Sequence, residues 1–323
     1  MAYKHDTTYG PGSLPHVGVP SNEPFGSLVR RNRFLFRVQD DNSQAKHDTN
    51  GFVAGGNIPQ DGNLTNAAIK HLDQNTRSSP SPFISLSFNL AWAIQDAHRR
   101  QHSDRAHPNT RIAVVDGLAL LHKVHAQLGV SIVDVAKANG AKACSRKRLQ
   151  QLRDFADVAQ EVLVLGKVPA SAIIGVVPWE DVVRASPSWF FKENKIQGGS
   201  KIKGGVRRRM NTVFVKARQD VVDAVAVEES VDFAAVLLGM EDGDSTDTLE
   251  ELAFYIYWWP LPTERRKAAR RWEEDGEAIR KKLSALYGCE ESRSSEWPEY
   301  LEYLKEFHYF EYLHRYGDDT EDY

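Results

Sequence analysis

The chain has 323 residues, of which 41% are hydrophobic and 26% are charged, and its formal net charge is −3. It is long enough for one large domain or two modest ones, and its composition is that of a globular protein. The near-neutral charge gives no reason to expect nucleic acid or an anionic membrane as a general partner. Only two cysteines are present, which excludes a disulfide framework as the basis of the fold.

The localisation expected from the sequence is cytoplasmic. No apolar run approaches the roughly 20 residues that span a bilayer, and the N-terminal residues lack the apolar centre of a secretory signal. A mature secreted protein is the alternative, and the initial Met favours the cytoplasm.

The first half of the chain predicts strands interspersed with helices. Residues 1–30 are rich in Gly, Pro, Ser and Asn without periodicity, which predicts a disordered leader. Runs of branched and aromatic residues predict strands at 34–38, 83–87, 111–116 and 161–165, and a further strand that reaches Gly175. Helical spacing of apolar residues predicts a helix that begins at Asn63 or Thr65 as N-cap and ends at Leu72, and helices at 89–98, 118–128 and 130–138. Another predicted helix carries Leu149, Leu152 and Phe155. The polar segment 99–110 is expected to be a loop, and Gly166-Lys167-Val168-Pro169 a turn.

The character of the sequence changes near residue 185. We expect a strand-rich domain at 31–185, a basic, Gly-rich linker at 186–212 and a helical region at 213–323. Residues 192–218 carry nine Lys or Arg against one acid. The basic cluster at 207–209 could bind RNA, an acidic partner or a phosphate, but it has no interleaved aromatic residues, which favours a solvated loop.

Polar side chains interrupt three otherwise apolar strands. Arg37 lies in the first, Ser85 and Ser87 alternate with apolar residues in the second, and Glu161 opens the third. A carboxylate at the head of a buried strand must be either paired or functional. The structural alternatives are an edge-strand charge for Arg37, ordinary strand hydroxyls for the serines and a salt bridge for Glu161.

These strands occur in an order that resembles a known family. Phe36-Arg37 comes first and Ile84-Ser85-Leu86-Ser87 second, and Gln160-Glu161-Val162 runs into the Gly-Lys-Val-Pro turn. The order and spacing resemble the mono-ADP-ribosyltransferase fold of the Arg-Ser-Glu type, and most closely the A subunits of cholera toxin and heat-labile enterotoxin. The resemblance covers about 34–182. It implies an α+β fold, with an ADP-ribosyltransferase-like split β-sheet domain and a helical C-terminal region.

The resemblance also implies a function and a role for each site residue. ADP-ribose would be transferred from NAD, a substrate, to a protein or small acceptor, and nicotinamide would be released. Glu161 would stabilise the positively charged ribose of the transition state, Arg37 would anchor NAD, and Ser85 would order the site. Ser87 would support the site from the same strand face. His71 matches the family's active-site histidine by position, and the alternative for it is an ordinary helix-end histidine.

One position departs from the family's pattern. The family has a second acid two residues before the catalytic glutamate, on the same strand face, where this chain has Ala159. Asp157 would lie on that face one pleat further away. Because the family uses the second acid to activate an arginine acceptor, the alternatives are a different acceptor, an NAD glycohydrolase, or a catalytically inactive binding or scaffold protein. Leu86, in place of the family's threonine, is expected to face the core.

Two further features carry no chemistry of their own. His122 and His125 have helical spacing, but no third ligand lies at a metal-binding distance in the sequence, so we expect no metal site. Aromatic residues recur at helical spacing within 297–316, which predicts packing onto the helical region or onto a partner.

Overall fold

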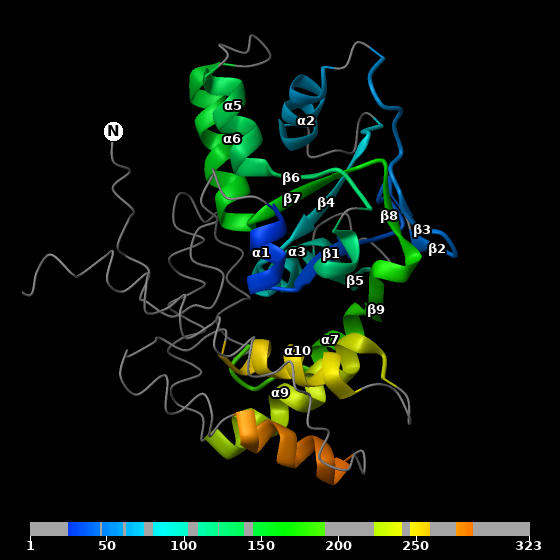
Figure 1. Cartoon of the computed structure of the whole chain (residues 1–323), viewed down its shortest axis with the longest axis vertical. Helices are drawn as coiled ribbons and strands as arrows, with labels where there is room; N and C mark the ends of the chain where they lie inside the picture. The colour runs from blue at the N-terminus through cyan, green and yellow to red at the C-terminus, as the bar shows by residue number, and fades with distance from the viewer. Residues whose placement is uncertain are drawn as a thin grey trace, which may run out of the picture.

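The computed structural model contains two antiparallel sheets with helices packed around them, a mixed α/β architecture (Figure 1). It describes residues 25–45, 47–60, 63–73, 80–102, 109–121, 123–138, 145–190, 223–240, 246–258 and 276–286. Several sequence predictions lie outside the described residues: the leader up to residue 24, His122, Cys144, Cys289, the basic cluster at 207–209 and the tail helix at 297–316.

The larger sheet has six strands in the order β6-β7-β4-β1-β5-β9, and the smaller has three in the order β2-β3-β8. The strands are β1 (Phe34–Gln39), β2 (His47–Asp48), β3 (Gly51–Val53), β4 (Phe83–Ser87), β5 (Arg111–Asp116), β6 (Ala126–Leu128), β7 (Glu161–Leu165), β8 (Lys167–Pro169) and β9 (Ile173–Pro178). The helices are α1 (Phe25–Arg31), α2 (Leu64–Asp73), α3 (Leu90–Gln101), α4 (Gly117–Leu120), α5 (Gly129–Ala138), α6 (Arg146–Ala159), the 3-10 helix η1 (Ala170–Ala172), α7 (Trp179–Ala185), α9 (Asp223–Leu238) and α10 (Thr246–Trp258). A further helix spans 276–286.

Four sequence predictions about these elements are wrong, and in each case contacts outweigh local pattern. Helix α1 begins inside the predicted leader, because it buries Leu28 and Val29. Helix α3 continues into the predicted loop, where Arg99 and Arg100 pair with Asp96 one turn earlier. The helix predicted at 118–128 contains the short α4 and then β6, which gains strand pairing with β7. The predicted Gly-Lys-Val-Pro turn is strand β8, which pairs with β3.

The centre of the larger sheet is split between β1 and β4. Strand β1 pairs with β5 along its whole length, and β4 does the same with β7. By contrast, β1 and β4 pair at one position, Phe36 opposite Ser87. The two strands therefore diverge, and polar backbone groups between them need other partners.

Alternate residues of the central strands supply cores on opposite faces of the sheet. Phe34 and Phe36 of β1 join a core formed with α3, α7, α9 and α10, whereas Leu35 packs toward α1, α4 and the smaller sheet. A third cluster holds α2, α5 and α6 against β4 and β7. In Figure 1, α2, α5 and α6 lie at one end of the molecule, and α7, α9 and α10 lie at the other.

Helices α9 and α10, from the region predicted to be helical, pack directly on the larger sheet. A Cβ atom on Gly175 of β9 would lie 2.1 Å from the carbonyl oxygen of Leu237, so α9 approaches as closely as a glycine allows. On α10, Glu251 accepts a 2.9 Å hydrogen bond from Arg33, which also pairs with Asp116 at 2.7 Å. The helical region thus shares a core with the strands instead of forming a separate layer.

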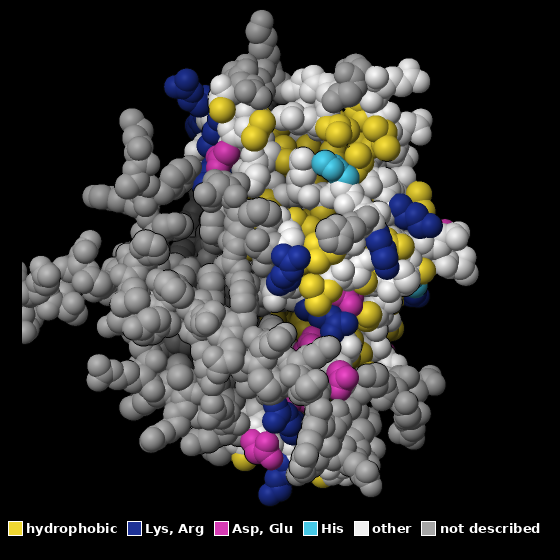
Figure 2. Space-filling view, viewed as in Figure 1, with side chains coloured by type: hydrophobic (Ala, Val, Ile, Leu, Met, Phe, Trp, Pro, Cys, Tyr) yellow, Lys and Arg dark blue, Asp and Glu magenta, His cyan; other side chains and the backbone are white. Residues whose placement is uncertain are grey.

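The surface seen in Figure 2 carries Lys and Arg side chains at scattered positions, with hydrophobic side chains gathered toward the upper right. Among the described helices, none has the length and apolar character needed to cross a membrane.

Candidate functional site

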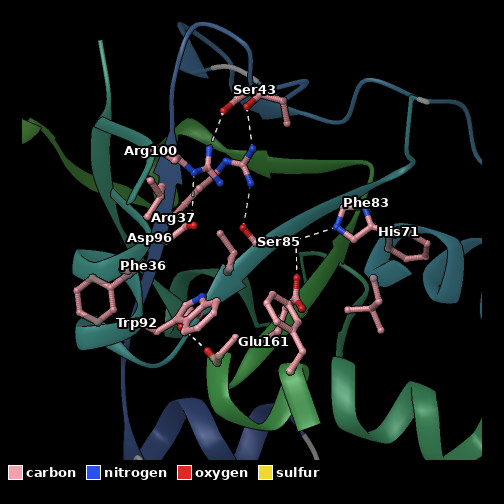
Figure 3. A pocket seen from close by; sticks show the side chains of 18 of the residues that line it. Phe36, Arg37, Ser43, His71, Phe83, Ser85, Trp92, Asp96, Arg100 and Glu161 are labelled. Atoms are coloured by element: carbon pink, nitrogen blue, oxygen red, sulfur yellow. Dashed lines mark hydrogen bonds and ion pairs between the residues drawn. The ribbon is translucent and has the colours of Figure 1, made fainter. Parts of the chain in front are cut away.

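The split between β1 and β4 opens beside a pocket with a volume of about 610 Å³. Its walls come from β1, β4, β7, α2, α3, α6 and the loop that follows β1 (Figure 3). All five site residues predicted from the sequence line it: Arg37, His71, Ser85, Ser87 and Glu161. The structure therefore brings together side chains that are separated by up to 124 positions in the sequence.

The guanidinium of Arg37 fills the gap between the two diverging strands. One terminal nitrogen donates a 2.9 Å hydrogen bond to the carbonyl oxygen of Ser85, and the other donates a 2.9 Å bond to that of Ala45. The guanidinium also lies 5.1 Å from the ring centre of Phe52. Arg37 is 9% exposed, so the edge-strand alternative is wrong. Burial and the nearby Arg100 lower its pKa to about 10, which leaves it charged at neutral pH.

Four side chains form a continuous hydrogen-bonded series, and three of them line the pocket. Ser81 Oγ lies 2.6 Å from His71 Nδ1, and His71 Nε2 lies 2.7 Å from Ser85 Oγ. Ser85 then donates a 2.6 Å bond to Glu161 Oε1 (Figure 3). Helix α2 supplies His71, the loop before β4 supplies Ser81, and adjacent strands supply Ser85 and Glu161.

Glu161 is buried, and only one of its two carboxyl oxygens has a hydrogen-bond partner among the described residues. Its side chain receives the bond from Ser85 at Oε1, whereas the buried Oε2 has no hydrogen-bond partner among the described residues. Burial raises the pKa of Glu161 to about 7. The hydrogen bond from Ser85 acts in the opposite direction and lowers this pKa, whereas the nearby Asp96 raises it. A carboxyl with this pKa and an unused oxygen is suited to hydrogen bonding with a ligand or to proton transfer. No ion pair to Glu161 is found in the described part of the chain, so the salt-bridge alternative is not supported there.

His71 is an uncharged member of this hydrogen-bonded series. Burial and the charge of Arg37 lower its pKa to about 4, so the imidazole carries no charge at neutral pH. Its ring contacts Phe83 edge-on at 5.9 Å, which fixes its orientation. The position-based match of His71 to the site is therefore consistent with the geometry.

Ser87 is committed to the backbone. Its hydroxyl donates to the carbonyl oxygen of Ala159 and accepts a 2.9 Å bond from the amide of Asn89. Because these contacts join the end of β4 to α6 and to the start of α3, Ser87 fixes the frame of the pocket. The core-facing orientation expected for Leu86 is confirmed by its 2% exposure.

The expected placement of Ala159 and Asp157 on the strand is wrong. Helix α6 runs to Ala159, and Gln160 ends it in the left-handed conformation, with φ of 46°. Strand β7 begins at the next residue, so neither 157 nor 159 shares a strand face with Glu161. The strong helix-forming content of 146–159 outweighs extension of the apolar strand toward its N-terminus.

Further residues at the pocket were not identified from the sequence. Arg100 bonds to Asp96 at 2.8 Å and to Asp40 at 3.0 Å, which places a partly buried charge network beside Arg37. Trp92 and Phe155 meet edge-on at 5.2 Å where α3 and α6 border the pocket. The four-residue spacing of Asp96 and Arg100 could have indicated a helical ion pair, but no sequence signal links either residue to the strands.

No group of three or more His, Cys, Asp or Glu side chains is placed to hold a metal ion within the described segments.

The fold and the pocket thus define a mixed α/β protein with a buried Arg-Ser-Glu cluster at a split sheet. Residues 30–182, just under half of the chain, match a family model described as a domain of unknown function (DUF7587). No curated protein and no solved structure gives a significant match to the chain.

Proposed function

We propose that the chain is an NAD-dependent mono-ADP-ribosyltransferase with an ADP-ribosyltransferase-like split-sheet fold. It would release nicotinamide and transfer ADP-ribose to a protein or small acceptor. The observation that carries this proposal is the convergence of Arg37, Ser85 and Glu161, from three different strands, at one pocket. The same order of motifs underlies the resemblance to the Arg-Ser-Glu family.

The arrangement suits cleavage of the bond between ribose and nicotinamide. That reaction passes through a ribose with developing positive charge, which a fixed carboxylate stabilises more than it stabilises the ground state. Glu161 Oε2 is free among the described residues to accept a bond from a ribose hydroxyl, while Ser85 holds Oε1. Arg37 supplies positive charge for NAD, and its buried Nε also has no partner in the described segments.

A second candidate is NAD hydrolysis, in which water replaces the acceptor. It is favoured by Ala159, because this position carries no carboxylate and ends a helix, away from the strand of Glu161. The neighbouring acid, Asp96, is held by Arg99 and Arg100. A catalytically inactive binding protein remains the alternative from another class.

Incubation of the purified protein with labelled NAD, with and without a cell lysate, tests the proposal. Label on protein supports the transferase, and free ADP-ribose alone supports the hydrolase. We expect Glu161→Gln to lower nicotinamide release roughly 100- to 1,000-fold, since it removes the negative charge that faces the ribose.

The matched control is Glu180→Gln, the same substitution at an exposed carboxylate in the first turn of α7. It should leave the rate of nicotinamide release unchanged. If wild-type protein binds NAD without Glu161-dependent release of nicotinamide, both enzymatic candidates fail and the binding-protein alternative stands.

A further inference from the structure

The hydrogen-bonded chain from Ser81 to Glu161 has a definite direction. A hydroxyl has one hydrogen, and that of Ser85 is donated to Glu161. Ser85 Oγ must therefore accept from His71, which places the imidazole proton on Nε2. Nδ1 of the neutral ring is then an acceptor, and Ser81 donates to it. With Glu161 ionised, every hydrogen along the chain points toward its carboxylate.

The hydrogen bonds from Ser81 to Glu161 can also all point in the opposite direction. If Glu161 is protonated, it can donate to Ser85, Ser85 to His71 Nε2, and His71 Nδ1 to Ser81. Both orders use the same three short contacts of 2.6 to 2.7 Å and keep the imidazole neutral. They differ by one proton.

We propose that Ser81, His71 and Ser85 form a proton relay that exchanges the proton of Glu161 at Ser81, the far end of the series, which is 7% exposed and does not line the pocket. A proton that enters at Ser81 displaces the Ser81 hydroxyl proton onto His71 Nδ1. The Nε2 proton moves to Ser85, and the Ser85 proton moves to Glu161. Each intermediate group gains one proton and loses one, so the net change is protonation of Glu161 alone. The reverse sequence releases the proton again at Ser81.

The charges around the hydrogen-bonded series favour a relay in which the imidazole of His71 stays uncharged. Arg37 of β1 faces His71 and opposes its protonation, and Asp96 of α3 faces Glu161 and opposes its ionisation. Arg100 is bonded to Asp96 and Asp40. A proton on Glu161 is therefore available near neutral pH, whereas a stable imidazolium is not.

The use of the relay in catalysis rests on the proposed function. When the bond between ribose and nicotinamide breaks, its electron pair leaves with nicotinamide, and a lone pair of the acceptor or of water forms the new bond to ribose. The proton lost by that nucleophile is taken up by Glu161. Because Ser81 does not line the pocket, the relay would let Glu161 exchange this proton while substrate covers the pocket.

The histidine tautomer tests the relay without substrate. In ¹⁵N-labelled full-length protein, two-bond ¹H–¹⁵N spectra distinguish a proton on Nε2 from one on Nδ1, and loss of a signal in His71→Gln assigns the ring. We expect the Nε2–H form above pH 7 and the Nδ1–H form below it. One fixed tautomer from pH 6 to pH 8, or an imidazolium in this range, would overturn the proposal.

Two variants control this measurement. Ser85→Ala interrupts the chain, and Glu161→Gln removes the titrating group with little change in volume, so the tautomer change should disappear in both. Its persistence in either folded variant would overturn the relay. Because no NAD is present, the result is independent of whether the protein releases nicotinamide.

If the protein does release nicotinamide, His71→Gln adds a kinetic test. The glutamine amide can donate to one serine and accept from the other but cannot pass a proton between them. We expect a rate roughly 100-fold lower, at the low end for proton-transfer groups, and loss of the multi-proton solvent isotope effect. A near-wild-type rate and isotope effect would show that His71 only positions Ser85, which would overturn the relay.

Discussion

Glu161 and His71 are buried ionisable residues with shifted pKa values. The two shifts have opposite effects on how the free energy of unfolding depends on pH. The pKa of Glu161 is raised from 4.5 to about 7, so the folded protein holds a proton that the unfolded chain has lost between these values. The pKa of His71 is lowered from 6.5 to about 4, so the unfolded chain binds the extra proton in that window. Glu161 makes the free energy of unfolding fall as pH rises, and His71 makes it rise.

The contribution of Glu161 to this pH dependence can be measured by replacing its carboxyl group. We expect the difference in the free energy of unfolding, wild type minus Glu161→Gln, to fall by about 3 kcal/mol between pH 4.5 and pH 7. Urea unfolding followed by circular dichroism at intervals of half a pH unit would measure it. The same difference for Glu180→Gln should be level, and a level curve for Glu161→Gln would contradict burial of the ionisable carboxyl.

The sequence predicted five side chains that line the pocket, but neither its other residues nor the hydrogen bonds between them. Arg37, Ser85 and Glu161 are recognisable because each interrupts an apolar strand, and the structure brings them to one pocket. Ser81 lies in a Ser- and Pro-rich segment that reads as a loop, although its hydroxyl contacts His71. Such a contact depends on how α2 packs against β4, which no local pattern specifies.

At the level of elements, strands were predicted best where polar or turn-forming residues bound the apolar run at both ends. Strands β4, β5 and β7 match their predicted bounds, and Asn63 and Asn89 accept hydrogen bonds at the starts of α2 and α3. Strand β6 was read as helix because its three residues form an edge that exists only through pairing with β7. Strand propensity likewise does not predict the divergence of β1 from β4, where Arg37 bonds to the carbonyl oxygen of Ser85.

The close packing of α9 on β9 gives a test at the same scale. We expect Gly175→Ala to lower the free energy of unfolding by about 1 to 3 kcal/mol, because the added methyl group would overlap the backbone of Leu237 and Leu238. Urea unfolding measures the change.

The control for this packing test is Gly26→Ala in α1. There the nearest atom to the new methyl group is Cδ2 of Leu121, at an ordinary 3.5 Å. Stability should be unchanged or higher by up to about 1 kcal/mol, since alanine favours helix over glycine. Equal stability of Gly175→Ala and the wild type would show that α9 does not press on β9.

At the level of the whole molecule, the packed core extends beyond the segment that matches the family model. Phe34 and Phe36 pack against Tyr255 of α10, with ring centres 6.1 and 5.9 Å apart. Tyr255 also donates a 3.0 Å hydrogen bond to the carbonyl oxygen of Phe88, next to the end of β4. Helix α10 therefore supports the strand that carries Ser85.

A fragment that ends at residue 190 should expose this apolar face. We expect residues 25–190 alone to aggregate or to bind a hydrophobic dye strongly, whereas the full chain does neither, because α9 and α10 are missing. Size-exclusion chromatography and dye fluorescence would measure the difference. A monodisperse fragment that unfolds cooperatively, with the full chain's stability, would show that the strands form an independent domain.

The direct passage from α6 to β7 limits how this pocket can diversify. Gln160 alone separates the helix from Glu161, so there is no loop whose length could vary without moving the carboxylate. If the proposed transferase function holds, new acceptor preferences at this rim would have to arise by exchange of side chains on α6, such as Gln151 and Phe155, which line the pocket. A library that randomises these two positions at constant chain length is therefore the economical route to altered specificity.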